Sequence, residues 1–139
     1  MTQNGSRAQL DERIEAIEGG YEFMLAYAAQ GRDTDKGAAA GRNVRDYLER
    51  MSAALDGLGA VIGACAASVD PSLATQAAAF FAAVDADARV AHAAVRLVLA
   101  RPDIGSQLID NLNASIHLRA LLTDLFVVDE ALKPGKSSA

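Results

Sequence analysis

The sequence predicts an all-α fold, an alanine-rich four-helix bundle with antiparallel up-down-up-down topology that pairs into a dimer. Alanine has the highest helix propensity and is abundant, whereas Val and Ile are too scattered to build several strands. Large apolar side chains recur at alternating steps of four and three residues, which aligns them on one stripe of a helix. Because the connections between these segments are short, neighbouring helices are expected to run antiparallel.

The chain has the length of one domain. Its 139 residues show no break in composition, and a chain of this size buries roughly two-thirds of its unfolded surface on folding. We expect a disordered N-terminus over 1–6, a single bundle domain over 7–132 and a flexible tail over 133–139, where Pro and Gly end the last helix.

The first helix is predicted over 7–30, where the large side chains from Leu10 to Met24 follow the four-three spacing. Gly19 and Gly20 lie within it, at a cost of about 1 kcal/mol each relative to alanine. We therefore expect another helix to pack closely against this point.

The second helix is predicted over 35–68, and the pair Thr34-Asp35 offers favourable N-cap residues for it. An unbroken helix of this length would span about 50 Å, which is long for a compact domain. A bend near one of its glycines, Gly57, Gly59 or Gly63, is therefore expected.

The third helix is predicted to start at Asp70-Pro71, because the Asp side chain can accept hydrogen bonds from free amides and Pro fits the first helical position. Pro102 ends this helix near Ala100, and the fourth helix then reaches about Leu132.

The fourth helix has more apolar residues than one stripe requires. Beside the stripe that includes Leu118 and Leu125, further apolar residues spread around the helix: Ile109, Ile116, Leu121, Phe126, Val127 and Val128. This surplus predicts a homodimer interface, since a small monomer needs only one apolar stripe. The alternative is that this helix is the more central one of a single bundle.

Charge and hydropathy exclude several classes of protein. A net charge of −5 disfavours nucleic-acid binding, and the longest uncharged run is shorter than the roughly 20 apolar residues of a membrane span. The polar N-terminal residues do not resemble a signal peptide, so a cytoplasmic protein is expected. The single cysteine, Cys65, has apolar neighbours and is predicted to be a buried thiol.

The sequence has no recognisable catalytic or cofactor motif. Glu-x-x-His pairs, which carboxylate-bridged metal sites in bundles use, are absent, because Arg89 and Ala114 stand three residues before the two histidines. No nucleophile elbow is present either. We therefore expect a non-catalytic protein without a metal or cofactor.

One end of the predicted bundle collects positive charge, because the first and third connections lie there together with two helix N-termini. The cations are Arg32, Lys36, Arg42, Arg45, Arg96 and Arg101. We hypothesise that they bind an anion or an acidic partner, with Tyr27 and Tyr47 as flanking contacts. The alternative is that they pair with nearby acids such as Asp35 and Asp103 and only solvate this end. The stretch 31–42 is not a phosphate loop, because no strand precedes it and no Lys-Ser/Thr pair closes it.

These features favour a small cytoplasmic accessory protein, such as a regulator, adaptor or assembly factor, that docks onto another protein and forms a homodimer through the fourth helix. The alternative function is a helical bundle that binds a small organic or anionic ligand between its helices. The residues expected to line that pocket are Tyr21, Met24, Tyr47, Met51 and Phe80. Large side chains at such positions are also typical of an ordinary core.

Overall fold

The computed structural model describes residues 3–37 and 39–133, and all regular structure in these residues is helical. The side chains of residues 3, 4 and 39–43 are outside this description. The described residues form seven helices: α1 (Gln3–Ala28), α2 (Ala39–Leu55), α3 (Leu58–Val69), α4 (Pro71–Gln76), α5 (Ala78–Leu99), α6 (Ser106–Asn113) and α7 (Ile116–Ala131). The all-α prediction is confirmed. The predicted number of four helices is wrong, because three of the predicted helices are divided.

The second predicted helix is divided at Gly57. This glycine has φ of 71°, in the left-handed region that glycine adopts without steric cost, and the segments Val44–Leu55 and Leu58–Val69 meet at 52°. The predicted start of this helix is also wrong. Asp35 caps no helix, and α2 begins at Ala39.

The third predicted helix starts as expected, because the Asp70 side chain accepts a hydrogen bond from the Ser72 amide at 3.0 Å and Pro71 follows it. The helix is interrupted at Ala77, so that α4 is one short segment and α5 runs on to Leu99. The last predicted helix is divided in the same way between α6 and α7.

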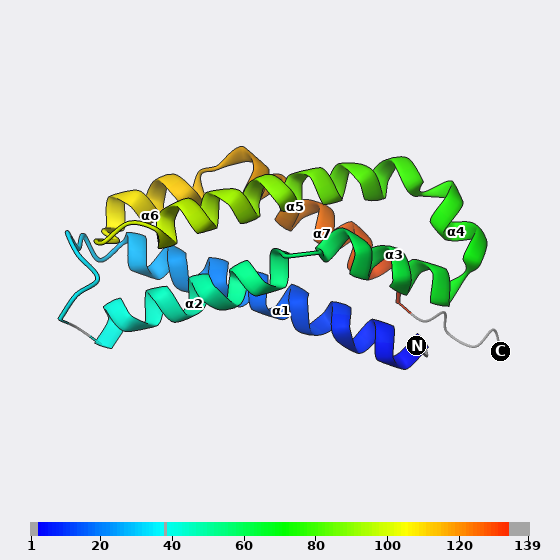
Figure 1. The fold of residues 1–139 in the computed structure, drawn as a ribbon, viewed down its shortest axis with the longest axis horizontal. Coiled ribbons are helices and arrows are strands. Elements are labelled where there is room, and N and C mark those ends of the chain that lie inside the picture. Colours follow the sequence, from blue (N-terminus) through cyan, green and yellow to red (C-terminus); the bar gives the residue numbers. More distant parts are fainter. Residues whose placement is uncertain (1–2, 38, 134–139) are drawn as a thin grey trace.

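The helices form an elongated body (Figure 1) in which α1 packs against α2, α3 and α6, while α5 packs against α2, α3 and α7. The loop after α1 and the loop after α5 meet at one end of this body, where the Ser106 amide donates to the Arg32 carbonyl oxygen at 2.7 Å. The start of α1 and the short helix α4 lie at the opposite end.

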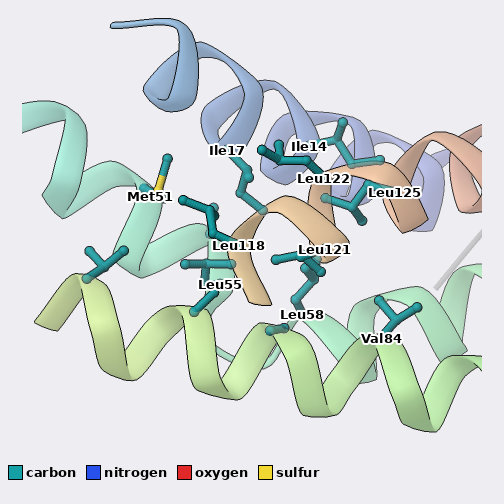
Figure 2. Packing of buried hydrophobic residues seen from close by; sticks show 14 of the residues in the cluster. Ile14, Ile17, Met51, Leu55, Leu58, Val84, Leu118, Leu121, Leu122 and Leu125 are labelled. Atoms are coloured by element: carbon teal, nitrogen blue, oxygen red, sulfur yellow. The ribbon is translucent and has the colours of Figure 1, made fainter. Parts of the chain in front are cut away.

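The core consists of apolar side chains from all the longer helices. Figure 2 shows Ile14 and Ile17 of α1 facing the leucines of α7, with Leu58 and Val84 on the other side. Cys65 is fully buried, as predicted, and burial raises the pKa of its thiol.

Two glycines permit close contact between helices. A Cβ at Gly20 would approach the Met51 side chain, so the predicted close packing is confirmed there, whereas Gly19 has nothing within 4 Å. A Cβ at Gly59 would lie 2.6 Å from the Cβ of Asp85, so α3 and α5 are in tight contact at this point.

No individual helix in residues 3–37 and 39–133 is both long enough and apolar enough to cross a membrane. The segments Val44–Leu55 and Leu58–Val69 reach that length and composition only as a bent pair.

Candidate functional site

The predicted basic end is organised around Asp35, whose side chain is buried. Its Oδ1 accepts a hydrogen bond from the Ile104 amide at 2.8 Å, and its Oδ2 accepts from Arg45 Nε at 2.5 Å. Burial would raise the pKa of Asp35, but the hydrogen bonds from Arg45 and Ile104, together with the arginine charge, hold it below its ordinary value. Asp35 therefore joins the first and third connections as a buried anion.

Arg45 is occupied by contacts within the chain. Besides Asp35, its guanidinium donates to the carbonyl oxygens of Leu99, Arg101 and Pro102 at 3.3, 2.9 and 3.1 Å. Carbonyl groups at a helix C-terminus lack intrahelical partners, and a cation is favourable beside them. Arg45 therefore caps the C-terminal end of α5.

The remaining predicted cations differ in their surroundings. Arg32 donates from Nε to the Thr34 carbonyl oxygen at 3.1 Å, and Lys36 Nζ lies 3.8 Å from an oxygen of Asp103. Arg96 and Arg101 are exposed, and neither has an ion-pair partner among the described residues. The Arg42 side chain lies outside the described residues.

These cations lie at one end of the structure, but several of them pair with the chain's own acids or donate to its carbonyl groups. This agrees with the alternative that the cations pair with nearby acids. Tyr27, expected to flank the site, is fully buried and donates from its hydroxyl to the Ile104 carbonyl oxygen at 2.6 Å. Anion binding at this end stays a prediction, and Arg96 and Arg101 are the exposed cations that form no ion pair in the described residues.

The five residues predicted to line a pocket are dispersed. Met24 and Met51 are fully buried, and Tyr47 stacks on Phe23 with ring centroids 4.3 Å apart. Phe80 is half-buried and packs against the core. Of these five residues, only Tyr21 is among those that line the cavities identified in the described residues.

That cavity belongs to a groove between α1 and α7. One of its two cavities, of about 410 Å³, is lined by Glu18, Tyr21, Glu22, Arg119, Leu122, Thr123 and Phe126. A second cavity of about 450 Å³ shares Glu18 and Glu22 and extends toward the start of α1 along Asp11, Ile14, Glu15, Gly19 and Asp129. We call these two cavities together the α1–α7 groove. Its lining includes two buried residues that Figure 2 labels, Ile14 of α1 and Leu122 of α7.

The α1–α7 groove is acidic. Asp11 and Asp129 are both bound by Arg7, whereas Glu15, Glu18 and Glu22 have no ion-pair partner within the described part of the chain. Burial raises the pKa of Glu18, and the carboxylates of Asp129 and Glu22 raise it further. The groove thus combines apolar surface with three carboxylates that form no ion pair in the described residues.

The outward side of α7 carries three exposed large apolar side chains. Ile116, Phe126 and Val127 are 74%, 61% and 54% exposed, whereas Ile109, Leu121 and Val128, also part of the predicted surplus, are core residues. The sequence thus predicted an excess of apolar residues correctly but could not divide it between core and surface. Phe126 lines the α1–α7 groove, whereas Ile116 and Val127 are not among its lining residues.

A further exposed apolar stripe on α5 was missed from the sequence. Its members follow the four-three spacing: Ala79, Ala83, Ala86, Val90, Ala93 and Leu97. The four-three spacing could have revealed this stripe. Because α5 carries alanines on both faces, however, composition alone does not separate the exposed stripe from the core stripe.

Each histidine lies beside one polar side chain. His117 Nδ1 lies 3.2 Å from Asp87 Oδ1, and His92 Nε2 lies 3.0 Å from Ser52 Oγ. In the part of the chain that the structure describes, no three His, Cys, Asp or Glu residues are grouped so that they could hold a metal ion.

Comparison with known proteins gives no relative. No family model, no curated protein and no solved structure matches this chain.

Proposed function

We propose that this chain is a non-catalytic accessory protein that acts by docking onto another protein and forms a homodimer through α7. The observation that carries the proposal is the exposure of Ile116, Phe126 and Val127 on one helix. Monomeric proteins rarely expose several large apolar side chains together, and such patches mark protein interfaces.

We place the dimer contact along one line of α7 that includes Ile116 and Val127. Ile116, Thr123 and Val127 are spaced by seven and four residues, so they lie on one line along the helix, with Ala120 between them. Two copies of such a helix can pack with their small and apolar side chains interleaved. In a dimer whose two-fold axis crosses α7, Val127 of both copies is buried at the contact.

The alternative is a small-molecule site, and one observation favours it. The cavity of about 410 Å³ in the α1–α7 groove has a volume in the range of ligand pockets and includes Tyr21, as the ligand hypothesis requires. Its carboxylates favour a cationic ligand over an anionic one.

A photoreactive amino acid at position 127 tests the docking face in living cells of the source organism. We expect a cross-linked product that contains a second copy or another protein, and none from the same amino acid at Glu49, which is exposed on α2. Equal cross-linking from both positions, or from neither, would contradict the proposal.

A further inference from the structure

The α1–α7 groove has the shape of a docking site for one helix. Along α1 it extends from Asp11 to Glu22, which is about 16 Å at 1.5 Å per residue, or about three helical turns. Ile14 and Leu122 supply apolar floor, and Phe126 stands exposed at the edge. Grooves of this kind accept the apolar face of an amphipathic helix through residues at positions i, i+3 or i+4, and i+7.

The charges of the groove select the partner. Five carboxylates line it, from Asp11, Glu15, Glu18, Glu22 and Asp129, and Arg119 is the one cation among its lining residues. The three glutamates form no ion pair in the described part of the chain, so a partner that brings cations gains attraction. An anionic membrane surface would be repelled by the same carboxylates.

We infer that the α1–α7 groove binds an amphipathic helix of another protein that carries Lys or Arg beside its apolar stripe. This inference rests on the proposed docking function and adds the chemistry of the partner. The raised pKa of Glu18 is consistent with it, because a cationic side chain placed beside this carboxyl would relieve the repulsion from Asp129 and Glu22.

The test uses a fluorescent synthetic peptide of about 14 residues, the length of a helix that fills the groove with short overhangs. Leu occupies one stripe of the peptide and Lys the remaining positions, and a control peptide has Glu in place of every Lys. Binding is measured by fluorescence anisotropy with the full chain. We expect the Lys peptide to bind about tenfold more tightly than the Glu peptide, and less tightly as salt rises.

Matched variants separate the groove from general attraction to an acidic protein. Glu18→Gln with Glu22→Gln should weaken binding of the Lys peptide about tenfold, whereas Asp46→Asn with Glu49→Gln, the same charge change on α2, should leave it unchanged. Phe126→Ala should weaken binding, and Leu97→Ala, which removes an exposed apolar residue from α5, should not.

Three results would overturn the inference. The first is equal weakening by the two double charge variants, and the second is unchanged binding in Phe126→Ala. The third is a loss of self-association in Glu18→Gln with Glu22→Gln, because the occupant would then be a second copy. Circular dichroism of each variant shows that it is folded. Dimerisation is tested at Val127, which does not line the groove, and the charge preference is tested at Glu18 and Glu22, which lie on α1 and not on α7. Failure of one proposal can therefore be distinguished from failure of the other.

Discussion

The contact between the loop after α1 and the loop after α5 depends most on Asp35. Replacement by Asn keeps an acceptor for the Ile104 amide but removes the charge that Arg45 pairs with. We expect Asp35→Asn to lower the free energy of unfolding by about 2 kcal/mol at neutral pH, measured by urea denaturation. Asp33→Asn, at an exposed neighbouring position, is the control and should change little.

The contribution of Asp35 should depend on pH. Its pKa in the folded protein is below the ordinary value of 3.8, so the carboxylate stabilises the fold above that value. This stabilisation is lost as the pH falls through the lower pKa of the folded state. The difference between wild type and Asp35→Asn should therefore shrink in acid, and a difference that grows in acid would contradict the assignment.

Asn113 is a buried side chain whose amide oxygen and nitrogen both lack a hydrogen-bond partner. Leu has nearly the same shape without the polar atoms, so Asn113→Leu should raise the free energy of unfolding by about 1 kcal/mol or more. Asn111→Leu is the control, because Asn111 is exposed on the same helix and accepts from Gln107. A loss of stability in Asn113→Leu would show that this amide does have a partner.

At the scale of the elements, α3 offers a matched pair of glycines one turn apart. Gly63→Ala should raise the free energy of unfolding by about 1 kcal/mol through helix propensity, since nothing lies within 4 Å of the added Cβ. Gly59→Ala should lower it by about 1 kcal/mol, because the Cβ would collide with Asp85 and the cost of overpacking exceeds the gain in propensity. Thermal denaturation compares the two variants. Equal stabilisation by both would show that α3 and α5 are less tightly packed than described.

The helix stripes could be predicted from the sequence, but the helix ends only in part. Spacing identified the core residues from Leu10 to Met24, and Asp70-Pro71 gave a correct helix start. The interruptions at Ala77 and between α6 and α7 contain no Gly or Pro, and Ser115, the N-cap residue of α7, is a weak signal for the second one. The sequence predicts Asp35 as a helix cap, because an Asp side chain suits that role. It does not reveal the hydrogen bond from the Ile104 amide, because Ile104 is distant in the sequence.

At the scale of the whole molecule, the sequence predicted which loops meet but not what surface results. The short connections implied that the first and third loops share one end, and the hydrogen bond between Arg32 and Ser106 lies there. The α1–α7 groove could not be foreseen, because it depends on how far apart two helices pack. In the sequence its glutamates have the pattern of an ordinary solvated stripe of a helix, and only the neighbouring Leu122 and Phe126 make them part of a groove.

The most direct test of docking through α7 is the mass of the protein in solution, measured by sedimentation equilibrium over a range of concentrations. Wild type should sediment as a dimer. Leu97→Glu, the equivalent change at an exposed position of α5, should also sediment as a dimer. Val127→Glu should sediment as a folded monomer, because a charge would be buried without a partner at the contact. A monomeric wild type, or a dimer that Val127→Glu leaves intact, would contradict the account.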